Sequence, residues 1–237
     1  MAEHIVRSFE QELKALSGSI AEMGGLAEGL VADSITALVR MDSELAQKVI
    51  TTDARLDRLQ RDVEERAILI IAKRQPMAMD LREIVGALRI SNDLERVGDL
   101  AKNIGKRVIA INGNFNSKKL VIGVEHLAEI ALEQLKDVLD SFTARDDARA
   151  LRVRGRDDEI DALYTSLFRE LLTYMMEDPR NISICTHLLF CAKNIERIGD
   201  HATNIAETVH YVVTGEQLAE DRPKGDTSHL INVLSDD

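Results

Sequence analysis

The sequence predicts an all-α protein built as a tandem repeat of two antiparallel three-helix bundles. Its composition is poor in strand formers, because aromatic residues make up only 3% of the 237 residues and tryptophan is absent. Apolar residues recur every three and four positions over long stretches, as they do on one face of a helix. In addition, the stretches "LERVGDLAKNI" and "IERIGDHATNI" repeat each other 101 residues apart.

We expect six helices, three in each half of the chain. Their approximate ranges are 4–41, 43–74 and 77–111 in the first half, and 118–143, 146–177 and 180–214 in the second. Pro76 and Pro179 each separate two long helical patterns and are predicted at helix starts, where proline is tolerated. The turn-rich stretch 112–119 has no apolar period and separates the two halves.

Each half should bury the apolar stripe of its third helix. The stripe residues are Ile90, Leu94, Val97, Ala101, Ile104 and Val108 in the first half, and Ile184, Leu188, Cys191, Ile195, Ile198, Ala202, Ile205 and Val209 in the second. Three helices with short connections bury such a stripe as an antiparallel bundle. We therefore predict one bundle at 1–113, a second at 114–215, and a mobile polar tail at 216–237.

Charge and cysteine content limit the class of protein. The net charge of −11 argues against a general binder of nucleic acid or anionic membranes, although it is compatible with a local basic patch. Cys185 and Cys191 lie about 120° apart on a helix, so we expect a reduced intracellular thiol pair. No signal peptide is visible, and no apolar run approaches the roughly 20 residues of a membrane span. These features predict a soluble, cytoplasmic protein.

Eight acidic residues share one spacing on the second and third helices of each half. They form the pairs Asp53/Asp57, Glu95/Asp99, Asp157/Asp161 and Glu196/Asp200. Each pair spans one helical turn, so its carboxylates lie about 6 Å apart along the axis. In each pair, the residue before one acid is apolar and lies on the core stripe: Leu56, Leu94, Ile160 and Ile195. We therefore expect the acids beside the core and not in it.

Counting residues from the prolines predicts that the acids on the two helices of one half lie at the same height along the helix axes. Asp57 precedes Pro76 by 19 residues, and Glu95 follows it by 19. Asp161 precedes Pro179 by 18 residues, and Glu196 follows it by 17. Equal counts in an antiparallel hairpin mean equal height. The expected facing pairs are Asp57 with Glu95, Asp53 with Asp99, Asp161 with Glu196, and Asp157 with Asp200, so each bundle should gather four carboxylates in one interhelical groove.

Four carboxylates at one height repel one another unless a positive charge lies between them. Arg96 and Arg197 are adjacent in sequence, but one residue of helix turns them about 100° away from the glutamates before them. A hard cation with oxygen ligands is the alternative, such as Mg²⁺, Mn²⁺, Ca²⁺ or iron. The sequence therefore favours a metal site in each groove.

Other residues near the acids have more than one interpretation. Asn103 and Asn204 continue the acidic stripe one turn further and can supply a carbonyl oxygen or orient a ligand. Gly98 and Gly199 lie inside helices, where glycine costs roughly 1 kcal/mol relative to alanine. Either close helix packing or room for a cation or a partner surface explains them. His201 has no counterpart in the first half and is interpreted as an exposed or capping histidine.

The stretches "DLERVGDLAKNI" and "NIERIGDHATNI", each paired with a D-x-x-x-D motif in a three-helix unit, resemble the PhoU family of bacterial phosphate-uptake regulators. The resemblance covers about residues 3–214. It implies tandem three-helix bundles, carboxylate motifs that hold metal clusters, and no enzymatic activity. It also implies a cytoplasmic accessory of the phosphate ABC transporter, peripheral to the inner membrane through that transporter. Such a protein signals phosphate sufficiency to a sensor histidine kinase and keeps phosphate-starvation genes off. Dimers are common for such repeats, so we expect a homodimer.

Carried over by position, the family's metal motifs fall on two sets of residues. The first set is Asp53, Asp57, Glu95 and Asp99, and the second is Asp157, Asp161, Glu196 and Asp200. The second unit ends in "NIAE", so Glu207 is a further candidate ligand, with Asn103 and Asn204. The first unit ends in "NIGK", with Gly105 and Lys106, so the two sites are expected to differ. The metal is left open among iron, Mg, Mn and Zn, and Arg96 and Arg197 are candidate partner contacts.

Two other functions fit parts of the sequence. A ferritin-like di-iron carboxylate bundle needs two E-x-x-H motifs on different helices, and this chain has one, from Glu207 to His210. A metal-free helical adaptor, whose acids recruit basic partner surfaces, is compatible with the same signalling role. Metal analysis of protein purified without chelator or His-tag separates the three functions. No nucleotide-binding loop, nucleophile triad or cysteine zinc site is visible in the sequence.

Overall fold

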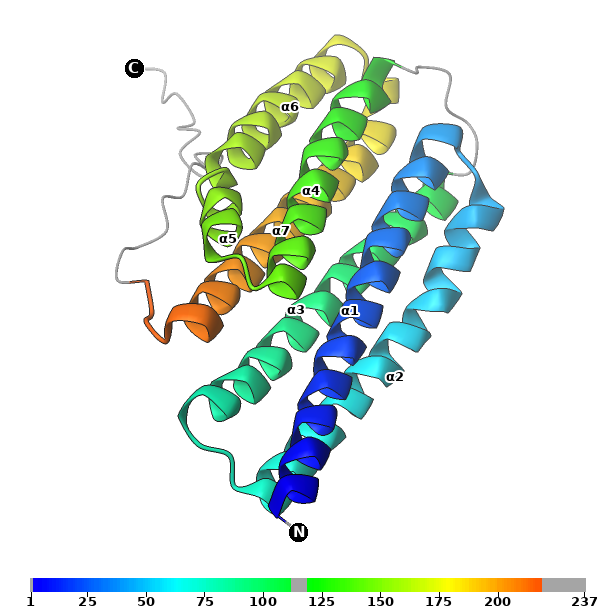
Figure 1. The fold of residues 1–237 in the computed structure, drawn as a ribbon. Coiled ribbons are helices and arrows are strands. Elements are labelled where there is room, and N and C mark those ends of the chain that lie inside the picture. The colour runs from blue at the N-terminus through cyan, green and yellow to red at the C-terminus, as the bar shows by residue number, and fades with distance from the viewer. Residues whose placement is uncertain (1, 112–118, 219–237) are drawn as a thin grey trace, which may run out of the picture.

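The computed structural model describes residues 2–111 and 119–218, which form seven α-helices, one short 3-10 turn and no strand. The first bundle consists of α1 (Ala2–Arg40), α2 (Ser43–Arg74) and α3 (Ala78–Ile111). The second consists of α4 (Lys119–Ala144), α5 (Asp147–Arg154), α6 (Asp157–Glu177), the turn η1 (Pro179–Asn181) and α7 (Ile182–Thr214). The predicted all-α tandem fold is confirmed (Figure 1). The predicted break at 112–119 and tail at 216–237 lie outside the described residues, except for Lys119 and residues 216–218.

In each bundle, an aspartate caps the N-terminus of the helix that follows the first one. Asp42 Oδ1 accepts hydrogen bonds from the backbone N–H groups of Glu44, at 3.0 Å, and Leu45, at 2.9 Å, where α2 starts. Asp146 Oδ1 accepts one from the backbone N–H of Arg149, at 2.9 Å, where α5 starts. An aspartate at this position satisfies N–H groups that the first helical turn leaves unpaired. The repeat therefore includes the helix starts as well as the acidic motifs.

The single helix predicted over 146–177 is wrong, because the chain breaks at Gly155 and Arg156 into α5 and α6. Basic residues end α5 and three acidic residues open α6. The helix dipole stabilises cations at a helix C-terminus and anions at an N-terminus. The buried side chain of Gln134 in α4 donates from Nε2 to the carbonyl oxygen of Arg156 at 2.9 Å, which holds the break in place. The change of charge in "RVRGRDDE" is the sequence signal, and apolar periodicity does not detect it.

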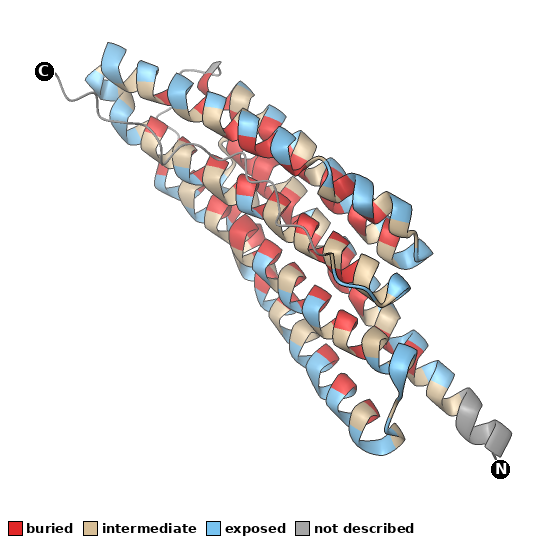
Figure 2. Cartoon of the chain, turned by 90° about the vertical axis from the view of Figure 1, so that its left-hand side faces the viewer, coloured by how far each residue is buried: buried red, intermediate tan, exposed pale blue. Residues whose placement is uncertain are grey.

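The third helices, α3 and α7, lie side by side and join the two bundles (Figure 1). They run antiparallel, because their contacts pair early residues of one with late residues of the other. A side chain at Gly86 would clash with Val212. Near the other end of α3, the guanidinium of Arg107 lies 4.2 Å from the ring centre of Phe190. The buried apolar side chains of both bundles consequently form one continuous cluster. Figure 2 shows the buried residues on the helix faces that turn toward one another.

The predicted apolar stripes are buried as expected. Every stripe residue of α3 is buried, and on α7 only Ile184 remains partly exposed. Cys185 and Cys191 are both free and buried, and burial raises the pKa of the Cys191 thiol to about 12. In the part of the chain that the structure describes, no helix combines the length and apolar character that a membrane span requires.

Candidate metal centres

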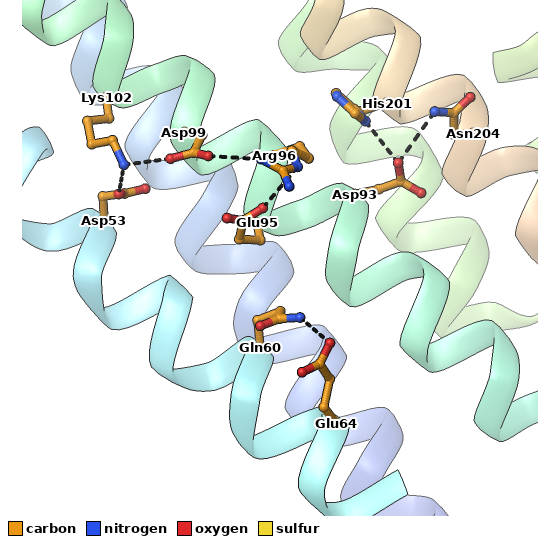
Figure 3. Close-up of polar contacts among 10 residues, drawn as sticks. All are labelled: Asp53, Gln60, Glu64, Asp93, Glu95, Arg96, Asp99, Lys102, His201 and Asn204. Carbon is orange, nitrogen blue, oxygen red and sulfur yellow. Dashed lines mark hydrogen bonds and ion pairs between the residues drawn. The ribbon is translucent and has the colours of Figure 1, made fainter. Parts of the chain in front are cut away.

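The first cluster lies between α2 and α3 and contains Asp53, Asp57, Glu95 and Asp99. Asp53 is buried, and the other three acids are partly exposed. Lys102 of α3 joins the two helices, because its Nζ lies 2.5 Å from Asp53 Oδ2 and 2.5 Å from Asp99 Oδ1 (Figure 3). The structure therefore brings Asp53 and Asp99 to the same height on facing helices, with a lysine between them.

The acids of the first cluster act on one another electrostatically. Burial raises the pKa of Glu95 above its ordinary value, and the carboxylates of Asp99, Asp57 and Asp53 raise it further, while Arg96 opposes the shift. Burial also raises the pKa of Asp53, against the opposing effect of Lys102. The four predicted acids of the first half therefore lie close enough to influence one another's charge.

Two carboxylate oxygens of the first cluster are buried without a hydrogen-bond partner, Asp53 Oδ1 and Glu95 Oε2. Glu95 Oε2 lies 3.4 Å from Arg96 Nε, which is an ion pair without hydrogen-bond geometry. A Cβ at Gly98 would lie 3.0 Å from Asp53 Oδ1. A buried polar atom left without a partner costs about 1–3 kcal/mol, more for a charged group. A cation with oxygen ligands would satisfy these atoms, so the residues of the first cluster fit a metal site.

The second cluster lies between α6 and α7 and contains Asp157, Asp161, Glu196 and Asp200. Asp157, Asp161 and Glu196 are 6%, 7% and 5% exposed. Burial raises the pKa of Glu196, and Asp200 and Asp161 raise it further, while Lys193 opposes the shift. Glu196 Oε2 is buried without a hydrogen-bond partner, so this cluster also fits a cation with oxygen ligands.

Two side chains of α7, Thr203 and Lys193, contact acids of the second cluster. The Thr203 hydroxyl donates to Asp157 Oδ1 at 3.0 Å. Lys193 Nζ donates to Glu196 Oε1 at 2.8 Å from one turn earlier on α7. In the described residues, as the side chains stand, no group of three or more Asp, Glu, His or Cys residues meets the geometry of a metal site. Metal binding at either cluster therefore stays a prediction.

Gly98 and Gly199 allow close contact between the helices that carry the acids. A side chain at Gly98 would clash with Leu56, and a Cβ at Gly199 would lie 2.5 Å from Ile160 Cδ1. The packing explanation for both glycines is therefore confirmed. This close approach also corrects the expectation that the acids lie only beside the core. Four of the eight are buried in the helix interface: Asp53, Asp157, Asp161 and Glu196.

The predicted residues beyond the acids have separate environments. His201 Nδ1 lies 2.8 Å from Asp93 Oδ1, and the Asn204 side chain donates to the same oxygen at 3.4 Å, across the seam between α7 and α3 (Figure 3). The expectation of an exposed or capping His201 is wrong, since its side chain is 16% exposed. Glu207 Oε1 accepts a hydrogen bond from Arg154 Nε at 3.1 Å. Asn103 is partly exposed on α3.

The two predicted partner-contact arginines are both exposed. Arg96 turns back over the first cluster, with Nη1 3.4 Å from Asp99 Oδ2 and Nε 3.4 Å from Glu95 Oε2. Its long side chain therefore offsets the 100° rotation expected from the sequence. Such exposed ion pairs typically contribute only about 0.2–1 kcal/mol. Arg197 lies at the corresponding position on α7.

The sequence argument missed Lys102, which contacts two of the predicted acids. Lys102 lies seven residues after Glu95 and three after Asp99, so helical periodicity places all three on one face. That spacing is the signal that indicates it. The predicted acid pairs are spaced by four residues, and the same spacing continued from Asp99 indicates Asn103 and not Lys102.

Comparisons with known proteins agree with this arrangement. A family model described as the PhoU domain matches twice, at residues 20–108 and 124–209. The chain is 62% identical over 233 residues to the phosphate-specific transport system accessory protein PhoU homolog of Rhizobium meliloti (strain 1021), and the match covers 98% of each chain. It is 53% identical over 226 residues to the homolog of the same name from Caulobacter vibrioides (strain NA1000 / CB15N), with 95% of this chain and 98% of the relative covered.

Two crystal structures have the same fold. PhoU from Pseudomonas aeruginosa superposes with a TM-score of 0.85 at 39% identity, covering 88% of this chain and 100% of that chain. The phosphate transport system regulatory protein PhoU from Streptococcus pneumoniae superposes with a TM-score of 0.82 at 28% identity, covering 89% of this chain and 99% of that chain.

Proposed function

This chain belongs to the PhoU family, and from that premise we propose that it regulates phosphate uptake and phosphate-starvation signalling. It acts in the cytoplasm as a homodimeric, non-enzymatic accessory of the phosphate ABC transporter. It contacts the transporter ATPase and the sensor histidine kinase, and keeps phosphate-starvation genes off when phosphate is plentiful. The names of its relatives, which are accessory proteins of phosphate-specific transport systems, support the transporter association.

The two acid clusters bind divalent or trivalent metal ions in this proposal, with iron, Mg, Mn and Zn as candidates. The observation that carries it is the set of buried acid oxygens without hydrogen-bond partners, Asp53 Oδ1, Glu95 Oε2 and Glu196 Oε2. Nearby carboxylates raise the pKa of all three residues, Asp53, Glu95 and Glu196. A hard cation both offsets that repulsion and supplies the missing contact.

The chain's own residues connect such a cation to the protein surface. Glu95 and Asp99 face the groove and also contact the exposed guanidinium of Arg96. A cation that takes these carboxylates as ligands weakens their hold on Arg96, since each oxygen can serve only a limited number of partners. The surface that a partner protein meets at Arg96, and by repetition at Arg197, then depends on whether the cluster is loaded.

A metal-free helical adaptor is the second candidate function. Lys102 favours it, because this lysine already neutralises part of the first cluster. The di-iron enzyme alternative has less support, since Glu207 contacts Arg154 and His210 Nδ1 lies 2.7 Å from Asp147 Oδ1. The E-x-x-H motif is therefore engaged with α5.

Elemental analysis of paired alanine variants tests the proposal. Glu95→Ala with Asp99→Ala should remove metal from the first cluster alone, and Glu196→Ala with Asp200→Ala from the second alone. The matched control is Glu64→Ala with Glu65→Ala, two exposed acids of α2 outside the cluster. Protein should be purified without chelator or His-tag. Absence of metal from the wild type would favour the adaptor.

Partner binding and gene expression supply the functional readout. Each cluster variant should bind the transporter ATPase and the kinase less well in pull-downs, and should express phosphate-starvation genes in rich phosphate. Loss of all metal from either pair of changes would show one shared site. Loss of metal with intact repression would contradict the proposed role of the clusters in signalling.

A further inference from the structure

A polar cavity lies on the seam between α3 and α7, outside both acid clusters. Its volume of about 420 Å³ falls within the roughly 300–1,000 Å³ of small-ligand sites. Arg89 and Asp93 of α3 line it on one side, and Asn204, Thr208 and Tyr211 of α7 line it on the other. A ligand held there contacts both bundles at once, because α3 belongs to the first bundle and α7 to the second.

Arg89 supplies a positive charge to this cavity. Its guanidinium carbon lies 5.3 Å from the ring centre of Tyr211, which is a cation–π contact. Such a contact uses the electrons of the ring, and the planar guanidinium keeps N–H donors that can bond two oxygens of one anion. Arg89 is exposed, and within residues 2–111 and 119–218 it pairs with no carboxylate. Its charge is therefore available to an anionic ligand.

The two carboxylates that line the cavity already contact other groups. Asp93 Oδ1 lies 2.8 Å from His201 Nδ1 and accepts a hydrogen bond from the Asn204 side chain at 3.4 Å (Figure 3). Glu207 Oε1 accepts a hydrogen bond from Arg154 Nε at 3.1 Å. These partners offset part of the repulsion that an entering anion meets. Asp93 Oδ2 makes no hydrogen bond with any described residue, so it can accept one from a ligand.

Thr208 adds a neutral donor at the wall of the cavity. The residue is only 7% exposed. A Cβ at Gly86 would lie 3.7 Å from Thr208 Cγ2, so the methyl group faces the backbone of α3 and the hydroxyl occupies the other branch of the side chain. In the parts of the chain that the structure describes, this hydroxyl has no hydrogen-bond partner. Because buried hydroxyls are normally hydrogen-bonded, Thr208 is suited to donate to a ligand in the cavity.

We infer that this cavity binds hydrogen phosphate, with Arg89 and Thr208 donating to its oxygens and Asp93 accepting a hydrogen bond from its remaining proton. The inference rests on the proposed role in phosphate regulation, for which it names the ligand. The proton selects the ligand, because sulfate carries none at neutral pH and a phosphate monoester loses its last one above a pKa of about 6. Either of these ions would present only acceptors to the Asp93 carboxylate, and like charges would then repel without a compensating hydrogen bond.

A bound hydrogen phosphate also links the two bundles. Arg89 belongs to α3 and Thr208 to α7, so an ion that accepts from both adds a bridge across the seam. Ligands that bind only the assembled form stabilise it by mass action. The contact between the bundles is therefore strengthened when phosphate is plentiful.

Equilibrium dialysis of the full chain against radiolabelled inorganic phosphate tests the inference. Excess chelator is present, so that phosphate cannot bind through metal ions at the acid clusters. At about pH 8, where a phosphate monoester is a dianion, we expect a single phosphate ion to bind per chain. Unlabelled sulfate and methyl phosphate should compete about tenfold less effectively than unlabelled phosphate, which corresponds to the loss of one hydrogen bond to a charged group.

Three substitutions assign the binding to this cavity. Arg89→Gln and Thr208→Val should each weaken phosphate binding by about tenfold or more, since each removes a hydrogen bond to a charged ligand. Arg61→Gln, at an exposed site of α2, is the control and should leave phosphate binding unchanged. Asp93→Asn should narrow the gap between phosphate and sulfate, because an amide can donate to an unprotonated oxygen. A merely structural role of Asp93 would weaken the binding of both ions without changing their ratio.

The outcomes separate this inference from the proposed function. Absence of phosphate binding by the wild type, or unchanged binding by both Arg89→Gln and Thr208→Val, would overturn the inference and leave metal analysis and pull-downs to decide the proposed function. Equal competition by sulfate would also overturn it. Loss of phosphate binding in these variants with intact repression of phosphate-starvation genes would uphold the binding site and contradict its role in regulation.

Discussion

Asp53 of the first cluster and Asp157 of the second occupy equivalent positions in the repeat, but the helices that carry them differ. In the first bundle, α2 runs without interruption through Asp53. In the second, the chain breaks at Gly155, and Asp157 opens the new helix α6. Equivalent carboxylates therefore come from the middle of one helix and from the first turn of another.

The first helix of each bundle accounts for part of this difference. The caps Asp42 and Asp146 mark equivalent points after α1 and α4, because the backbone N–H of each donates to the carbonyl oxygen five residues earlier, at 2.9 Å in both cases. With this alignment, Leu30 of α1 stands where α4 has Gln134. Only Gln134 has a side chain that can bond the broken backbone, and it does so at Arg156. The repeat therefore keeps the spacing of the carboxylates while the backbone that carries Asp157 differs from the one that carries Asp53.

The largest expected effect tests whether the cores of the two bundles contribute equally to the free energy of unfolding. Leu94→Asp and Ile195→Asp each place an unpaired charge at a fully buried position, since both residues are 0% exposed. We expect a loss of several kcal/mol in the free energy of unfolding for each, measured by chemical denaturation. Lys106→Asp, at an exposed site on α3, is the control and should cost less than about 1 kcal/mol. A marked difference between the two core variants would show that one bundle tolerates the charge by local opening.

The next effect concerns the close approach of the helices at the glycines. Gly98→Val and Gly199→Val should each cost about 1–3 kcal/mol, because the added side chain meets Leu56 or Ile160. Gly98→Val should also weaken metal binding at the first cluster, since its side chain approaches Asp53 Oδ1. Gly25→Ala is the control: its site on α1 is open, so it should stabilise the protein by up to about 1 kcal/mol. Thermal unfolding of the three variants measures these changes.

A change at the break between α5 and α6 should have a smaller effect, and it should affect the second bundle and not the first. Gln134→Leu removes the hydrogen bond to Arg156 and should cost about 1 kcal/mol, partly offset because Gln134 Oε1 is itself buried without a partner. Metal affinity should fall at the second cluster, whose Asp157 follows the break directly, and stay unchanged at the first. Equal losses at both clusters would show that Gln134 acts on the whole fold and not on this break.

The smallest effect concerns the charge balance of each cluster without metal. Asp99→Asn loses an ion pair with Lys102 and should destabilise the metal-free protein by about 0.5–1 kcal/mol. Asp200→Asn relieves repulsion with Glu196 and should be neutral or slightly stabilising. Denaturation curves of the two variants in chelator compare them directly. Stabilisation by Asp99→Asn would show that repulsion among the carboxylates outweighs the ion pair between Asp99 and Lys102.

The amino-acid sequence alone predicts the all-α class, the tandem repeat and the buried stripes, and it predicts that Asp53 and Asp99 meet between two helices. These features follow from the 3.6-residue period of the helix and from equal residue counts on two arms of a hairpin. Both are local rules, which depend on the spacing of residue types along one chain segment and not on how deeply helices approach each other.

The groups that neutralise, bury and support the acids come from contacts between helices, which the sequence does not predict. Lys102 meets Asp53 across 49 residues of chain, and His201 meets Asp93 across 108. The burial of Asp53 and Glu196 depends on how closely glycine lets two helices approach, and the break before Asp157 depends on a glutamine from another helix. The spacing of residues within a helix does not fix these contacts, because they depend on the distance and rotation between packed helices.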